Sequence, residues 1–396
     1  MAYGSNLFAQ IVKLVPRVVF EDLVARTGAQ RCAKGFNSWD HLVAMLFCQF
    51  AQAKSLREIS DGLRTTCGKL NHLGMAQSPA KSTLSYANSH RSCELFERLF
   101  YDILRRCQSE SPGKKRKFRF KCKLLSLDAT TIDLCLGLFP WARFRQTKGA
   151  VKLHLLLDHD GYLPIFANIT EGRTNEVRVA QGLTLPRGSI VAMDRGYCDA
   201  ALYQRWTDEG VFFVTRLKEN TTYDVVKEHT LPSHGHALLD QSIRFNGRRT
   251  RLRCPAVLRR IVVWDDTNQR EIVLLTNHLA FAASTISAIY KERWEIELFF
   301  KALKQHLKIK TFVGTSENAL KTQIWTALIT ILLIRYMQFR SRCALPLCRL
   351  VALLRWNLFT YRQLWDWLNN PFDVPPEEPT RQLAFAFGIA SVENAI

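Results

Sequence analysis

The segment YKERWEIELFFKALK, residues 290–304, contains the pattern on which the interpretation of the whole chain depends. Successive side chains of an α-helix are about 100° apart, so residues spaced as Y-x2-R-x3-E-x6-K lie on one narrow face. These residues are Tyr290, Arg293, Glu297 and Lys304. A separate arc carries the apolar stripe of a helix that packs on a core, with Ile296, Phe299, Phe300, Leu303 and Leu307. We therefore expect one helix, from about residue 284 to 307, with a carboxylate between an aromatic hydroxyl and two cations.

This polar face has an ordinary interpretation as well, because an exposed helix with an Arg293–Glu297 ion pair would show the same spacing. Two apolar strands elsewhere in the chain shift the balance. Asp128 lies within a strand predicted at residues 124–132, and Asp194 ends another. A carboxylate in an apolar strand is unfavourable unless it is paired or bound to a metal ion.

Both aspartates have alternatives. Each could cap the loop at a strand end, and Asp194 could pair with Arg195, the next residue. Asp133 is a rival to Asp128, but it has the opposite strand parity and should face the other side of the sheet. Phosphoryl transfer with two divalent ions, about 3.5–4 Å apart, needs several carboxylates close together. Asp128, Asp194 and Glu297 therefore form a candidate set of metal ligands.

The chain divides into zones by composition and periodicity. The first zone is helical, with candidate N-caps at Ser38, Ser55 and Ser82. Its helices could read DNA or simply form a bundle. The basic linker that follows is either a solvated connector or a strap that contacts phosphates. The zones are 1–110 (helical), 111–123 (linker), 124–340 (alternating strands and helices, with short strands at about 220–283, among them 252–258) and 341–396 (helices and tail).

The composition favours a polyanionic partner. The net charge is +20, from 55 Lys and Arg against 35 Asp and Glu, so nucleic acid is the first candidate and an anionic membrane surface the second. Hydrophobic residues make up 47% of the chain, which excludes a disordered protein. The 11 cysteines contain no C-x-x-C pair, which argues against a disulfide framework and a thiolate zinc site. We expect a cytoplasmic, nucleoid-associated protein with no membrane partner.

The spacing of Tyr290, Arg293, Glu297 and Lys304 resembles the signature of the insertion-sequence four group of DDE transposases. DRGY, beginning at Asp194, resembles the second-aspartate motif of that group. LDAT, residues 127–130, resembles the strand that carries the first aspartate in that group. The resemblance covers roughly residues 115–335. It implies an α/β fold, with a ribonuclease H-like core that carries a β-rich insertion. An α-helical N-terminal domain would precede this core and C-terminal helices would follow it.

The resemblance also implies the chemistry of the site. Asp128, Asp194 and Glu297 would hold two Mg²⁺ ions, for which Mn²⁺ could substitute. The phosphates beside the scissile bond would be contacted by Tyr290, Arg293 and Lys304. Lys301 and Arg195 lie nearby and could add DNA contacts, with a solvated position as the alternative for Lys301.

The activity implied is cut-and-paste transposition of an insertion sequence. Metal-dependent hydrolysis at the transposon ends would free a 3′-hydroxyl, which would then attack target DNA. The partners would be double-stranded DNA at the element ends and the target, and a second copy of the chain in a synaptic homodimer. The alternatives are a ribonuclease H-like nuclease that does not join strands and an inactive DNA-binding relative.

Two further features each have two interpretations. Trp294 could stack on a displaced base, but its place at the edge of the apolar stripe favours the core. A run of arginines in the inserted region could contact DNA or form a solvated strand edge: Arg244, Arg248, Arg249, Arg251 and Arg253.

Overall fold

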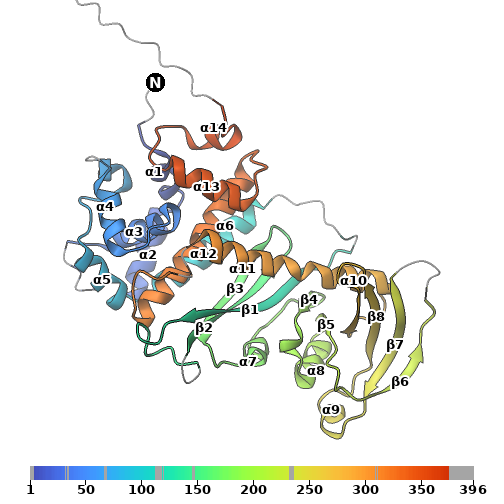
Figure 1. The fold of residues 1–396 in the computed structure, drawn as a ribbon. Helices are drawn as coiled ribbons and strands as arrows, with labels where there is room; N and C mark the ends of the chain where they lie inside the picture. The colour runs from blue at the N-terminus through green and yellow to red at the C-terminus, as the bar shows by residue number, and fades with distance from the viewer. Residues whose placement is uncertain are drawn as a thin grey trace, which may run out of the picture.

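The computed structural model describes residues 4–373, except 32, 34, 67–68, 112–117, 119, 145–147, 232–235, 308 and 310. Most of the basic linker and the end of the C-terminal tail therefore lie outside the described residues. Within them, the centre of the fold is one nine-stranded sheet with the order β3-β2-β1-β4-β5-β9-β8-β7-β6 (Figure 1).

The first five strands form the core half of the sheet. They are β1 (Leu124–Leu134), β2 (Gly149–Asp158), β3 (Leu163–Glu171), β4 (Ile190–Met193) and β5 (Phe212–Arg216). The three strands β1, β2 and β3 are antiparallel neighbours, whereas β4 and β5 run parallel to β1. This order and these directions are those of a ribonuclease H-like sheet, so the expected α/β fold class is confirmed.

The inserted region extends the same sheet. Its strands are β6 (Tyr223–Glu228), β7 (Ala237–Phe245), β8 (Leu258–Asp265) and β9 (Arg270–Thr276), and β9 pairs with β5. The expected strand at 252–258 is wrong, because the arginine-rich helix α9 (Arg248–Arg253) occupies its start and β8 begins only at Leu258. The arginine run thus lies partly on an exposed helix rather than along a strand edge.

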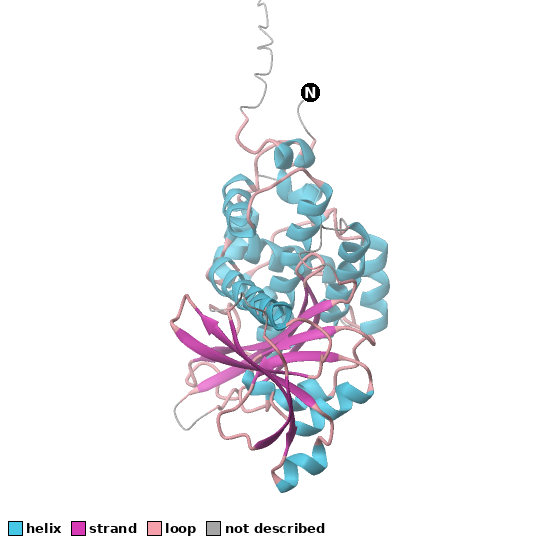
Figure 2. Cartoon of the chain, turned by 90° about the vertical axis from the view of Figure 1, so that its right-hand side faces the viewer, coloured by secondary structure: helices cyan, strands magenta, loops and turns pink. Residues whose placement is uncertain are grey.

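Helices cover both faces of the sheet (Figures 1 and 2). On one face, α10 (Ala283–Glu292) and α11 (Trp294–His306) cross the strands, with α10 over β4 and β5 and α11 over β1. The opposite face is covered by α7 (Glu176–Gln181) and α8 (Ala200–Asp208), and a short 3-10 helix, η2 (Arg195–Tyr197), follows β4. Strand alternation therefore decides which of the two helical layers each side chain meets.

The expected continuous helix at 284–307 is in fact two helices joined at Arg293. The backbone N–H of Arg293 bonds to the carbonyl of Tyr290, and that of Ile296 bonds to the carbonyl of Arg293. Both bonds join residues three apart, which is a tightened 3-10 type of turn. The apolar stripe is confirmed, because its members in the described chain are buried: Ile296, Phe299, Phe300, Leu303 and Leu307.

The N-terminal and C-terminal helices form one further body. They are α1 (Leu7–Val12), α2 (Arg17–Thr27), α3 (Ser38–Ala51), α4 (Leu56–Arg64), η1 (Lys69–Leu73), α5 (Lys81–His90), α6 (Glu94–Glu110), α12 (Glu317–Arg340), α13 (Leu347–Asn357) and α14 (Leu364–Asn369). A single hydrophobic core runs from these helices to the α11 side of the sheet. No helix in the described part of the chain is long and apolar enough to span a bilayer.

The helix starts in this body differ in part from expectation. Ser55 is the N-cap of α4, as expected, and its hydroxyl accepts from the N–H of Glu58. Asn37, not Ser38, caps α3, because its side chain and that of Asp40 form a reciprocal capping box. Helix α5 begins at Lys81 after Ala80, which provides no side-chain cap.

Candidate active site

Two aspartates are brought together by the register of the sheet. Parallel pairing of β1 with β4 places Leu127 opposite Met193. Asp128 is the next residue on β1, and Asp194 is the first residue after β4, so both lie at the edge where β4 ends. Asp128 shares its strand parity with Ile132, which packs under the α11 layer. Asp133 has the opposite parity and is exposed.

Arg293, at the junction of α10 and α11, joins the first aspartate to the glutamate. Its Nη1 is 3.4 Å from Oδ2 of Asp128, and its Nη2 is 2.5 Å from Oε1 of Glu297. Arg293 and Asp128 expose only 12% and 18% of their side chains. Asp128 is far from the other two residues in the sequence, whereas Glu297 follows Arg293 by one helical turn, and one guanidinium holds both carboxylates.

The environment of Asp128 disfavours its charge. Burial raises the pKa of the Asp128 carboxyl to about 7; the N–H of Ala129 and the charge of Arg293 lower it, and the charges of Asp194 and Glu297 raise it. Arg293 therefore offsets the cost only in part. An additional cation at this position would be bound favourably.

Tyr290 lies between two guanidinium groups. Its ring centroid is 5.7 Å from Cζ of Arg293 and 5.5 Å from Cζ of Arg216, at the end of β5. These distances are within the range of cation–π attraction. Asp194 also acts on this tyrosine, because its charge raises the pKa of Tyr290, which burial raises most. Arg216 is a site residue that the sequence reasoning missed.

Lys304 is fixed against the strand that carries Asp128. Its Nζ donates to the backbone carbonyl of Thr131 at 3.0 Å. Arg293 and Lys304 thus both contact β1, Tyr290 lies beside Arg216 of β5, and Glu297 is tied to this edge through Arg293.

Three other candidate residues make no hydrogen bond or ion pair with Asp128 or Glu297 in the described part of the chain. Arg195 is exposed on the turn after Asp194. Lys301 is exposed on α11 and lines a cavity of about 580 Å³ together with Glu295 and Arg335. Trp294 is 56% exposed, so the interpretation of it as a core residue is wrong; the tightened turn at Arg293 places it on the outside of α11.

The donor chemistry of the site fits a divalent cation. Asp128, Asp194 and Glu297 offer carboxylate oxygens, the ligands that Mg²⁺ prefers, and the raised pKa of Asp128 indicates a need for more positive charge. Among the described residues, no three acidic, His or Cys side chains are already grouped closely enough to hold an ion. Arg293 supplies the positive charge that Asp128 and Glu297 share.

The sequence matches two known families. The family described as "Transposase DDE domain" matches residues 120–333, more than half of the chain. A second family, described only as a domain of unknown function, matches residues 3–76.

Among solved structures, the cryo-EM structure of the piggyBac transposase synaptic complex with hairpin DNA overlaps with a TM-score of 0.42. It is 10% identical over 89% of this chain and 84% of that chain.

Curated relatives are similar over most of the chain. "Putative transposase y4zB" of Sinorhizobium fredii is 29% identical, covering 78% of this chain and 87% of its own. "Probable transposase for insertion sequence element IS5377" of Geobacillus stearothermophilus is 28% identical, covering 66% and 68%. The family match spans β1, β4, the turn after β4 and the α10–α11 pair, and so includes the two aspartates, Arg293 and Glu297. The chain therefore belongs to the DDE transposase family.

Proposed function

We propose that the chain is the transposase of an insertion sequence, which cleaves DNA at the element ends and joins the freed 3′-hydroxyl to target DNA. The observation that carries this proposal is the guanidinium of Arg293, which pairs with both Glu297 and Asp128, the latter on the strand next to β4, the strand that Asp194 follows. It belongs to a chain of net charge +20, which suits a polyanionic substrate.

Asp128, Asp194 and Glu297 would hold two divalent ions, Mg²⁺ or Mn²⁺. When bound, such ions lower the pKa of a coordinated water and stabilise the attacking and leaving oxygens of an in-line displacement. The protein would contribute the three carboxylates as ligands, and Arg293 holds two of them, Asp128 and Glu297. The raised pKa of Asp128 supports this role, because the ionised carboxylate gains most from a cation beside it.

The cations of the site would orient the DNA backbone. Arg293 contacts Asp128, Lys304 is bonded to the same strand, and Arg216 lies beside Tyr290 at the end of β5. Arginine is well suited to phosphate because its planar guanidinium can donate two parallel hydrogen bonds. Arg195 is exposed on the turn after Asp194 and Lys301 is exposed on α11, and both would add contacts with DNA.

Double-stranded DNA is the proposed partner, and a second copy of the chain would hold the other element end. Trp294 presents an aromatic face to solvent directly after Arg293, where a base displaced beside the scissile phosphate could stack. The exposed arginine helix α9 lies in the inserted half of the sheet, and we assign it contacts with DNA away from the cleavage site.

The test uses DNA carrying the inverted repeats that flank the gene, a target plasmid and Mg²⁺. We expect cleaved ends with a 3′-hydroxyl and products joined to the plasmid. Asp128→Ala, Asp194→Ala and Glu297→Ala should each abolish both products while end binding persists. Cleavage without joined products would replace the proposal with a nuclease, and end binding without any cleavage by the parent chain would replace it with a DNA-binding protein.

A further inference from the structure

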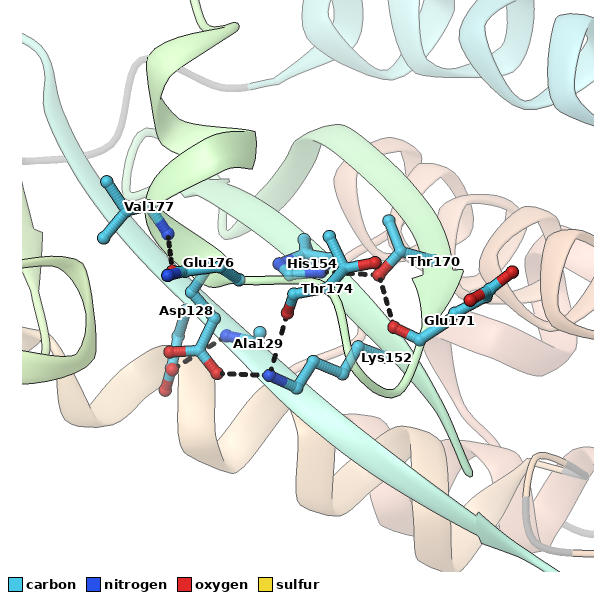
Figure 3. Close-up of polar contacts among 10 residues, drawn as sticks. Asp128, Ala129, Lys152, His154, Thr170, Glu171, Thr174, Glu176 and Val177 are labelled. Atoms are coloured by element: carbon cyan, nitrogen blue, oxygen red, sulfur yellow. Dashed lines mark hydrogen bonds and ion pairs between the residues drawn. The ribbon is translucent and has the colours of Figure 1, made fainter. Parts of the chain in front are cut away.

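A second ion pair lies beside the strand that carries Asp128. Nζ of Lys152, on β2, is 3.1 Å from Oε1 of Glu176 at the start of α7 (Figure 3). The same Nζ donates to the backbone carbonyl of Thr174 at 3.1 Å. The two side chains expose 16% and 28% of their surface. Lys152 therefore holds one oxygen of the Glu176 carboxyl in a fixed, partly shielded position.

The other oxygen of Glu176 packs against the turn after Asp194. A Cβ added at Gly196 would collide with Oε2 of Glu176, and, chain neighbours aside, no other described residue has an atom within 4 Å of that Cβ position. Glycine is therefore required at 196 for the close approach of this carboxyl. The contact links α7 to η2, the short helix that directly follows Asp194.

The position of Asp194 is not fixed by strand pairing. β4 has only four residues and its pairing with β1 ends at Met193, the residue before Asp194. The side chain of Asp194 makes no capping hydrogen bond to the turn that follows. The position of this catalytic candidate relative to Asp128 therefore depends on how the turn is held.

The hydroxyl of Tyr197, at the end of η2, is affected by the charges of both Glu176 and Asp194. The tyrosine side chain is fully buried, and its hydroxyl has no hydrogen-bond partner within the described part of the chain. Burial raises the pKa of Tyr197, and the charges of Asp128, Glu176 and Asp194 raise it further. One buried hydroxyl at the end of η2 thus experiences the field of all three carboxylates.

We propose that Glu176, held by Lys152, is a positioning residue of the transposase site. Its carboxyl seats the turn Asp194–Tyr197 from the α7 face of the sheet and so fixes Asp194 beside Asp128. Asp128 meets Arg293 from the opposite face, so Glu176 acts through the turn and not on the DNA. This inference rests on the proposed function for its effect on cleavage, but the seating of the turn is a structural claim of its own.

The test compares five variants with the parent chain, the fifth being Lys152→Arg. Glu176→Gln removes the charge and keeps the shape, and Lys152→Met removes the counterion. Gly196→Ala keeps Glu176 but displaces its carboxyl; the displaced atom is the end of a flexible side chain, so folding should persist. Glu317→Gln, which breaks the Lys321–Glu317 pair of 2.6 Å on α12, is the matched control.

Two measurements separate the structural claim from the function. Hydrogen exchange of the amides of residues 194–198 in the DNA-free protein should accelerate in Glu176→Gln and Gly196→Ala and stay unchanged in the control. Single-turnover cleavage should slow by about 10–100-fold in these variants, as for other supporting residues of metal sites. End binding should change by less than about twofold, because no DNA contact is removed. Lys152→Arg should restore most of what Lys152→Met loses.

Unchanged exchange at 194–198 in both Glu176→Gln and Gly196→Ala would overturn the proposal, whatever the cleavage rates. Faster exchange with an unchanged cleavage rate would overturn the positioning role and leave a purely structural contact. If the parent chain itself cleaves no DNA, the proposed function fails, while the exchange measurement still decides whether Glu176 seats the turn.

Discussion

Replacing Asp128 with asparagine should make the metal-free protein more stable at pH 8 while it abolishes cleavage. The side chain is 18% exposed and its pKa is raised from 3.8 to about 7, chiefly by burial. A folded-state pKa above the unfolded value means that the folded protein keeps its proton to higher pH than the unfolded chain. The free energy of unfolding therefore falls as the pH rises from about 4 to about 7, and it stays lower above that.

The magnitude follows from the difference between 3.8 and about 7. Each pH unit corresponds to about 1.4 kcal/mol, so full ionisation of Asp128 costs the folded state about 4 kcal/mol at pH 8. An asparagine at this position carries no charge, so Asp128→Asn should recover up to that amount at pH 8 and almost none at pH 4. Such a gain would mark Asp128 as a residue retained for function at the expense of stability.

The assay is urea unfolding in the presence of a chelator, at pH 4 and pH 8. Asp133→Asn is the matched control, because Asp133 lies on the same strand but is exposed and should change stability little. Adding Mg²⁺ at pH 8 should then stabilise the parent chain more than Asp128→Asn, since a ligand of the folded state raises its stability by mass action. An Asp128→Asn variant no more stable than the parent at pH 8, or a similar gain for Asp133→Asn, would refute the reasoning.

The remaining predictions concern binding, base stacking and acid stability. Affinity for the element ends should fall by about 10³–10⁵ between 50 and 200 mM salt if 6–10 phosphates are contacted; a filter-binding series with a flat salt dependence would contradict phosphate contacts as the main source of affinity. Trp294→Ala should slow cleavage more than it weakens end binding, because the base is proposed to stack on Trp294 only when it is displaced beside the scissile phosphate. A stacked base contributes about 1–3 kcal/mol, and equal effects on cleavage and binding would assign Trp294 to general binding. Burial lowers the pKa of His41 from 6.5 to about 3, so its contribution, about 5 kcal/mol, is present above pH 6.5 and is lost as the pH falls toward 3. His41→Gln should therefore flatten the acid limb of a stability–pH curve measured by urea unfolding, and a limb as steep as that of the parent would count against it.

Local spacing was enough to predict the Arg293–Glu297 pair, because one helical turn separates the two residues. Their place in apolar strands made the two aspartates candidates only, and their role as metal ligands, implied by the family resemblance, stays a prediction. The 3-10 turn at Arg293 could not be foreseen, because it depends on where α10 and α11 pack on the sheet. That turn also explains why the pattern placed Trp294 in the core while the structure exposes it.

Contacts between distant segments were beyond the reach of the sequence. Arg216 reaches Tyr290 only because β5 lies under α10, and no spacing in the chain encodes that neighbourhood. Lys152 and Glu176 are separated by a whole strand, so neither carries a local signal. The only feature of the sequence that points to Arg216 is its position at the end of a strand that follows the DRG segment.

The helical body also limits how DNA recognition can be assigned to residues 1–110. Helix α12 is buried on nearly all sides, so it requires partners all around it. It finds them in α3, α5 and α6: the side chain of Gln49 donates to the carbonyl of Gln323, and that of Asn318 donates to the carbonyls of Asn88 and Arg91. Removing residues 1–110 would expose α12, which continues the core beneath α11 and Glu297. Loss of cleavage after such a truncation would therefore say nothing about DNA reading, and only substitutions of exposed residues of this body, such as Tyr86 on α5, can separate recognition from support of the site.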